Sequence, residues 1–185
     1  VDVSSSMRGE PIEAVRAGML KMVDSLNPKD TLVLVTYSST AEIVLQSDPT
    51  SDPDRLLLRD ALPNLEANGG TNLYAGLRLA LEEVAKLQDN DRQNRVIMLS
   101  DGNPTEGVTS RERIIRLGES YATDGIGITT IGVGQNFDLE LMQRLREKGN
   151  VNESLNEHPA AVQEVIVDAV NTFQEPLPEE IRKKF

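Results

Sequence analysis

Cysteine is missing from this 185-residue chain, which excludes both a disulfide framework and a thiolate metal site. Histidine occurs once, as His158, in a weakly patterned stretch where a place at the start of a helix is its expected role. No pair of a serine nucleophile and a histidine base is evident. Long apolar runs are also missing: none approaches the roughly 18 residues that span a membrane, and no signal peptide is visible. This segment is therefore not expected to insert into a membrane.

Basic residues are in the minority. The chain has 19 lysines and arginines against 30 aspartates and glutamates, a formal net charge of −11. This excess of negative charge disfavours nucleic acid or an anionic membrane surface as a partner, and it favours cations, including divalent metal ions. The length suffices for one domain with a core of two or three layers.

What the sequence does contain is an alternation of strand-like and helix-like segments. Residues 31–37 (TLVLVTY), 95–99 (RVIML) and 126–133 (IGITTIGV) are nearly continuous in apolarity, as central strands buried on both faces are. Residues 41–45 (AEIVL) follow the first of these after a short turn, which predicts an antiparallel hairpin partner. We therefore expect an α/β fold: a three-layer, doubly wound, mostly parallel sheet with one antiparallel edge strand and helices on both faces.

Apolar stripes at helical spacing predict the helices. Shorter helices are expected at 54–62 and 139–148, and a short polar sixth strand at 149–158. Pro176 and Pro178 should stop the last helix, so residues 174–185 are predicted to be a linker or the start of a further segment. The four long stripes comprise Ile12, Val15, Met19, Met22, Val23 and Leu26; Leu73, Leu77, Ala80, Leu81, Val84 and Leu87; Ile114, Leu117 and Tyr121; and Val162, Val165, Ile166, Ala169, Val170 and Phe173.

Oxygen-bearing side chains follow the strands at the edge where ligands bind in parallel α/β sheets. Asp2, Ser4 and Ser6 follow the first strand, Asp101 follows the strand at 95–99, and the loop at 67–72 brings Thr71 to the start of a helix. Each piece alone is compatible with an ordinary capping turn or a turn after a strand. Together they predict a site for a hard divalent cation, Mg²⁺ above all. Uncharged hydroxyl ligands would leave the ion electron-poor, so that an incoming carboxylate binds strongly.

These motifs resemble the von Willebrand factor A (VWA) domain family and its metal-ion-dependent adhesion site, or MIDAS. The family's Asp-x-Ser-x-Ser motif is matched by residues 2–6 (DVSSS), its threonine loop by residues 69–72 (GGTN), and its second aspartate by residues 100–102 (SDG). The stretches RVIMLSDGNPTEG and GITTIGVG are similar to those of bacterial members. The likeness covers residues 1–173, which are therefore identified as a VWA domain with a Rossmann-like fold.

The resemblance implies the roles of the site residues. Ser4, Ser6 and Thr71 would touch the metal directly or through water, with Asp2 and Asp101 close by. Mg²⁺ or Mn²⁺ is the expected ion, with Ca²⁺ as an alternative, and a protein partner would supply an aspartate or glutamate to it. Three departures stand out: Ser5 replaces a common glycine, residues 149–157 lack the aromatic residues often found at the sixth strand, and the family's apolar residues ahead of Asp2 are missing. We expect the first strand to be truncated and to begin upstream of Val1.

The leading functional hypothesis is a binding module for adhesion or scaffolding, and not an enzyme. One alternative is a metal-dependent docking subunit of an assembly with an AAA+ ATPase, or of a chelatase-like complex. A metal-dependent phosphoryl-transfer enzyme that uses Asp2 is less favoured, because Ser4 stands where aspartyl phosphatases carry a second acid. A cell-envelope or extracellular location is favoured over a cytoplasmic one, and no oligomeric state is predicted.

Overall fold

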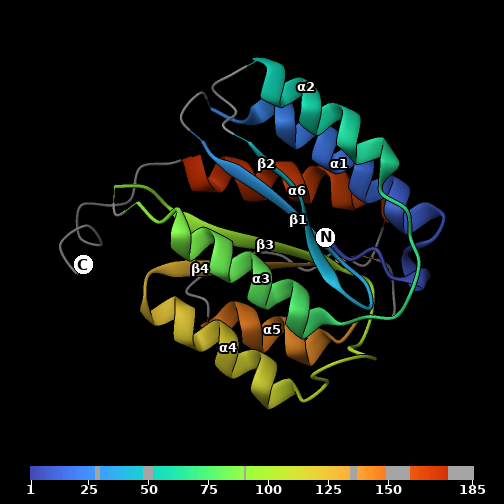
Figure 1. Ribbon diagram of the computed structural model, residues 1–185, viewed down its shortest axis with the longest axis vertical. Coiled ribbons are helices and arrows are strands. Elements are labelled where there is room, and N and C mark those ends of the chain that lie inside the picture. Colours follow the sequence, from blue (N-terminus) through green and yellow to red (C-terminus); the bar gives the residue numbers. More distant parts are fainter. Residues whose placement is uncertain (28–29, 48–51, 90, 134–136, 149–158, 175–185) are drawn as a thin grey trace.

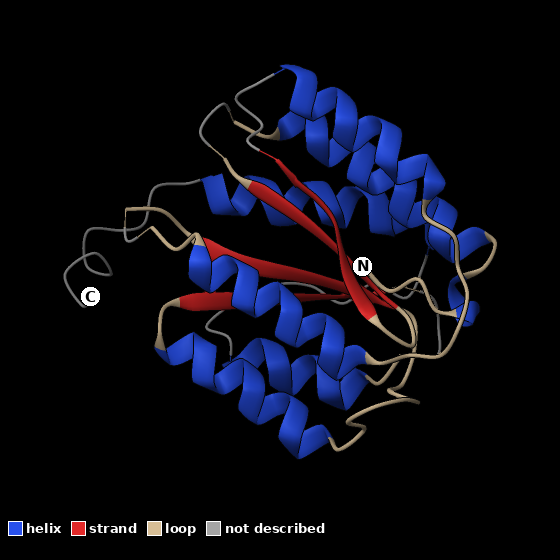
Figure 2. Ribbon diagram, in the orientation of Figure 1, coloured by secondary structure: helices blue, strands red, loops and turns tan. Residues whose placement is uncertain are grey.

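Helices cover both faces of a central group of strands (Figure 1; Figure 2). The computed structural model describes residues 1–27, 30–47, 52–89, 91–133, 137–148 and 159–174. One face carries α1 (Glu10–Ser25), α2 (Asp52–Ala61) and α6 (Pro159–Gln174), and the other carries α3 (Leu73–Lys86), α4 (Arg111–Thr123) and α5 (Leu139–Lys148). Two short 3₁₀ turns, Ser5–Met7 and Leu62–Asn64, complete the helical segments. The predicted three-layer architecture is confirmed.

The described strands form two hydrogen-bonded pairs. β1 (Leu32–Tyr37) and β2 (Ala41–Ser47) make an antiparallel hairpin with a register shift between Leu34 and Val35. β3 (Asn94–Ser100) and β4 (Ile126–Gly132) pair in parallel along their full length. The hairpin edge and the parallel strands therefore lie where the sequence predicted them.

Residues 1–3 join the two strand pairs. Asp2 forms a parallel bridge with Tyr37, and Val3 donates a backbone hydrogen bond of 2.8 Å to the Tyr37 carbonyl. On the opposite side, the Asp2 amide donates to the Leu99 carbonyl at 2.9 Å. The order across the sheet is thus β2, β1, residues 1–3, β3 and β4, so the first three residues lie at its centre.

An apolar cleft separates β1 from β3. It begins at Val1 and extends away from the serines. It has a volume of about 800 Å³, and its walls include Met22, Val33, Leu77, Val96 and Met98. β1 and β3 do not pair with each other along this length.

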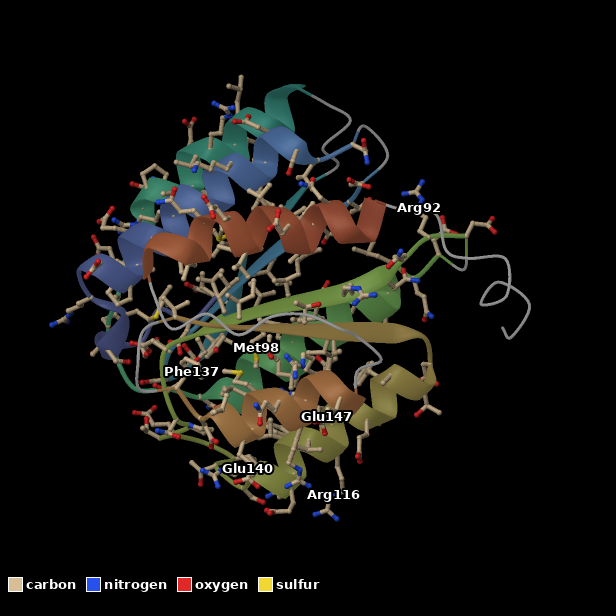
Figure 3. All side chains as sticks on the ribbon, turned by 180° about the vertical axis from the view of Figure 1, so that it is seen from behind. Arg92, Met98, Arg116, Phe137, Glu140 and Glu147 are labelled. Carbon is tan, nitrogen blue, oxygen red and sulfur yellow. The ribbon has the colours of Figure 1, made fainter. Side chains whose placement is uncertain are left out.

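Alternate residues of the parallel strands face opposite helical layers. In β3, Val96 and Met98 pack into the cluster that contains α3, α4 and α5, whereas Ile97 and Leu99 contact the cluster around α1 and α6. Figure 3 shows Met98 within the molecule, while the charged side chains that it labels lie toward the outside. The continuous apolarity of the predicted strands thus reflects burial on two faces.

The helices begin and end close to their predicted positions. α1 starts at Glu10 with a proline in its first turn, after Gly9 at φ 82° and ψ −129°. Asn72 caps α3 by accepting a hydrogen bond of 3.1 Å from the Ala75 amide. The predicted sixth strand at 149–158 lies outside the described residues, as does most of the predicted linker. None of the helices in the described part of the chain is long and apolar enough to cross a membrane.

The contact between α3 and β1 gives a test of the packing. A Cβ atom on Gly76 would stand 2.3 Å from Cδ1 of Tyr37, whose side chain is buried. Helix propensity alone would make Gly76→Ala stabilising by about 1 kcal/mol, but overpacking against the ring costs about 1–3 kcal/mol. We therefore expect a lower free energy of unfolding in urea than that of the wild type. A variant as stable as the wild type, or more stable, would contradict this packing.

Candidate functional site

The serine turn places two hydroxyls side by side at the carboxyl end of the first strand. Ser4 Oγ lies 3.0 Å from Ser6 Oγ, and Ser6 Oγ donates a hydrogen bond of 2.8 Å to Asp101 Oδ1. Ser4 is buried, whereas Ser6 is exposed. Ser4 has an extended backbone, and the 3₁₀ turn at Ser5–Met7 begins directly after it, so the chain turns back and Ser6 comes to lie beside Ser4.

Asp2 lies beneath the serines and is fully buried. Its Oδ1 accepts a hydrogen bond of 2.8 Å from the Ser4 amide, and its Oδ2 accepts one of 2.6 Å from Ser100 Oγ. Both oxygens of the carboxylate are therefore already engaged by the protein. Asp2 thus ties the serine turn to the end of β3, the strand that leads to Asp101.

The loop that carries Thr71 is held by the serine turn and by the β1–β2 hairpin. The Asn68 amide donates to the Val3 carbonyl at 2.7 Å, and the Ser5 amide donates to the Gly69 carbonyl at 3.1 Å. On the hairpin side, the Gly70 amide donates to Ser39 Oγ at 3.0 Å. Gly69 has φ 75°, a backbone conformation that favours glycine. Thr71 itself is 4% exposed.

Gly102 marks the place where the three motifs meet. A Cβ atom on this residue would stand 3.7 Å from Ser6 Oγ and 4.0 Å from Thr71 Oγ1. The absence of a side chain here leaves space between hydroxyls that are far apart in the sequence. The structure thus brings together all five residues that the sequence singled out, Asp2, Ser4, Ser6, Thr71 and Asp101, through direct contacts or across this space.

The two carboxylates of the site repel each other electrostatically. Burial raises the pKa of Asp101 above its ordinary value, and the charge of Asp2 acts in the same direction, against the hydrogen bond from Ser6. Among the residues that the structure describes, no salt bridge reaches Asp2 or Asp101. Two buried carboxylates without a cationic side chain favour the binding of a cation, because it offsets the cost of removing both charges from water.

The chemistry of the donors fits a hard divalent ion. The described residues contain no cluster of three or more acidic, histidine or cysteine side chains, so hydroxyl oxygens would have to supply ligands beside the carboxylates. An all-oxygen set with few carboxylates suits Mg²⁺, which retains several of its waters, or Mn²⁺. The side chains of Ser4, Ser6, Thr71 and Asp101 could hold such an ion, while Asp2 acts beneath them.

Comparison with known proteins assigns the family. The family model of the von Willebrand factor type A domain matches residues 1–103, a stretch that holds all three motifs. The chain belongs to the von Willebrand factor type A family. Among curated proteins, this VWA domain is similar to protein sll0103 of Synechocystis sp., with 26% identity over 95% of the chain and 39% of that protein. It therefore spans less than half of this relative.

Solved structures agree with the fold. The VWA protein from Catenulispora acidiphila superimposes with a TM-score of 0.79 at 17% identity, over 91% of this chain and 40% of that one. Proximal thread matrix protein 1 from the mussel byssus, solved with a zinc-occupied MIDAS motif, superimposes with a TM-score of 0.71 at 18% identity, over 91% and 45% of the two chains. At these identities the likeness shows the fold alone.

Two further residues lie at the site without a sequence motif that indicates their role. Ser100 directly precedes Asp101, yet its hydroxyl bonds to Asp2, 98 residues away, a contact that no local pattern indicates. Thr105 accepts a hydrogen bond of 2.9 Å from the Thr71 amide. Ser100 could have been noticed because it is a polar residue at the carboxyl end of an otherwise apolar strand. The loop position of Thr105 carried no such signal.

Removing the Ser100 hydroxyl tests how much its hydrogen bond to Asp2 contributes to stability. Ser100→Ala leaves one oxygen of a buried carboxylate without its partner, which costs about 1–3 kcal/mol. We expect that loss in the free energy of unfolding in urea, measured with EDTA present. Ser5→Ala is the matched control, because Ser5 is exposed and should change stability by less than about 0.5 kcal/mol. Equal stabilities of the two variants would contradict the assigned contact.

Proposed function

We propose that this VWA domain is a protein-binding module that captures a partner's carboxylate through a divalent cation held at a MIDAS. The observation that carries the proposal is the joining of Ser4, Ser6 and Asp101 by side-chain contacts, with Ser6 Oγ and Thr71 Oγ1 both near the space beside Gly102 and the buried Asp2 beneath the serines. Mg²⁺ is the favoured ion, with Mn²⁺ as a substitute and Ca²⁺ as a further alternative. The zinc-occupied motif in the mussel protein supports a divalent ion at the equivalent place.

The residues divide the work of holding the ion. Ser4, Ser6 and Thr71 offer neutral oxygens, and Asp101 offers a negative charge beside Ser6. Asp2 acts from below. It accepts a hydrogen bond from the Ser4 amide and contributes negative charge, and both of its carboxylate oxygens are already hydrogen-bonded within the protein. A bound Mg²⁺ would supply an electron-poor coordination position for an aspartate or glutamate of the partner. With a net charge of −11, the chain offers an acidic partner little other attraction, so binding should depend on the ion.

A binding role fits the site better than phosphoryl transfer does. An aspartyl nucleophile must reach its substrate, whereas Asp2 is fully buried with both oxygens engaged. The only histidine, His158, lies outside the described residues. A docking subunit of an AAA+ or chelatase-like assembly would use the same metal-dependent contact. It differs from an adhesin in its partner, and the residues of the site do not favour either one.

The charge on Asp101 gives the sharpest test of the metal site. Asp101→Asn keeps the size of the side chain and an acceptor for Ser6, but it removes a negative charge. We expect Mn²⁺ affinity, measured by titration calorimetry, to fall at least about a hundredfold, with the circular dichroism spectrum unchanged. The exposed Asp124→Asn makes the same change in net charge and should bind like the wild type. Retained affinity in Asp101→Asn would overturn the site.

The partner can be sought by affinity capture with the immobilised chain. We expect a protein that is retained in Mg²⁺, released by EDTA, and not captured by Asp101→Asn. Blocking its carboxyl groups by amidation should prevent capture, because the proposed contact is a carboxylate. A set of partners that is indifferent to EDTA would contradict metal-dependent capture.

A further inference from the structure

Thr71 is joined to the loop after β3 by a reciprocal set of hydrogen bonds. Its amide donates to Thr105 Oγ1 at 2.9 Å. Its carbonyl accepts from the amides of Thr105 at 2.9 Å and Glu106 at 3.2 Å. Both polar groups of the Thr71 backbone are thus engaged by two consecutive residues, and one of these contacts depends on a side chain.

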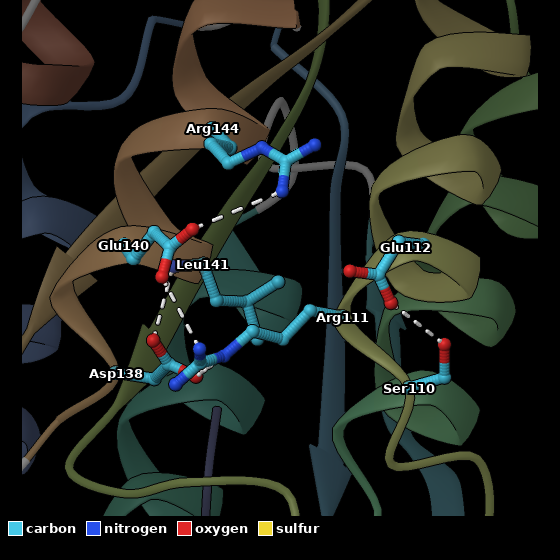
Figure 4. A network of polar contacts seen from close by, with 7 residues as sticks. All are labelled: Ser110, Arg111, Glu112, Asp138, Glu140, Leu141 and Arg144. Atoms are coloured by element: carbon cyan, nitrogen blue, oxygen red, sulfur yellow. Dashed lines mark hydrogen bonds and ion pairs between the residues drawn. The ribbon is translucent and has the colours of Figure 1, made fainter.

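The loop that makes these contacts is fixed at both ends. It begins at Asp101, which is hydrogen-bonded to Ser6, and ends at Ser110, the cap of α4. Just beyond that cap, Arg111 donates to the buried Asp138 at 2.6 Å and forms an ion pair with Glu140 at 3.2 Å, which ties α4 to α5 (Figure 4). Both ends of the loop that contacts Thr71 are therefore held in place by hydrogen bonds.

The same loop also lies directly against the residues on either side of Thr71. Gly107, at φ 65°, approaches so closely that a Cβ atom there would stand 2.4 Å from Asn72 Oδ1. A Cβ atom on Gly70 would meet the carboxylate of Glu106. A shift of this loop would therefore displace Thr71 and its neighbours together.

We infer that Thr105 is a positioning residue for the metal site: its hydroxyl holds the Thr71 amide and so places Thr71 Oγ1 at the space beside Gly102. The inference rests on the proposed metal site. The two carbonyl contacts come from backbone amides and survive most substitutions at 105, so only the hydroxyl contact depends on the side chain. Thr71 is buried and Thr105 is exposed, so removing that hydroxyl takes away the partner that the protein provides for the Thr71 amide.

The test compares three variants of the whole chain. Thr105→Val removes the hydroxyl at nearly constant shape, and Thr105→Ser keeps it. Thr109→Val makes the first change at another exposed threonine of the same loop, away from the hydrogen bond between Thr105 and the Thr71 amide. We expect Thr105→Val to weaken Mn²⁺ binding in calorimetry by about tenfold, and the other two to stay within about twofold of the wild type. Equal affinities of Thr105→Val and the wild type would overturn the inference.

A second measurement separates this inference from the proposed function. In EDTA, the exchange of the Thr71 amide with deuterated solvent, followed by NMR, reports the contact without any metal. Thr105→Val should speed this exchange by about tenfold relative to Thr105→Ser, and unchanged exchange would overturn the positioning role. A wild type that fails to bind Mn²⁺, with exchange still faster in Thr105→Val, would overturn the metal site and leave the contact itself supported.

Discussion

The backbone hydrogen bonds of residues 1–3 are the constraint on which the rest of the structure depends. They connect the Tyr37 end of β1 to the Leu99 end of β3, and no direct pairing between those strands replaces them. The same three residues deliver Asp2 to the middle of the sheet edge. The same backbone hydrogen bonds therefore hold the two strand pairs together and place the site.

The site follows from that placement through a chain of polar contacts. Buried Asp2 needs partners for both oxygens, and it finds them in the Ser4 amide and the Ser100 hydroxyl. These contacts set the serine turn against the end of β3, where Asp101 meets Ser6. What is left without a partner is negative charge, and a cation is the simplest way to compensate it.

The fold was largely predictable because its signals are local. Nearly continuous apolarity at 95–99 and 126–133 indicated strands buried on both faces, and β3 and β4 occupy those positions. The residues of the candidate site were found by their motifs and by the rule that ligands bind at the carboxyl ends of strands. Ser100 and Thr105 were not assigned, because their importance arises from contacts with Asp2 and Thr71, which depend on how distant segments pack.

The conformation at Gly9 has a mechanical consequence. Its φ of 82° and ψ of −129° are open to glycine almost alone, and no atom lies within 4 Å of where its Cβ would be. The turn that carries Ser4 and Ser6 is thus linked to α1 through one torsionally soft residue. Rotation at Gly9 would reorient the serine turn relative to α1 without a side chain of its own in the way, while the buried Met7 holds the turn against the core. The Thr71 loop is hydrogen-bonded to the serine turn, to Ser39 of the β1–β2 hairpin and to Thr105, so a displacement of Thr71 is transmitted to all three segments.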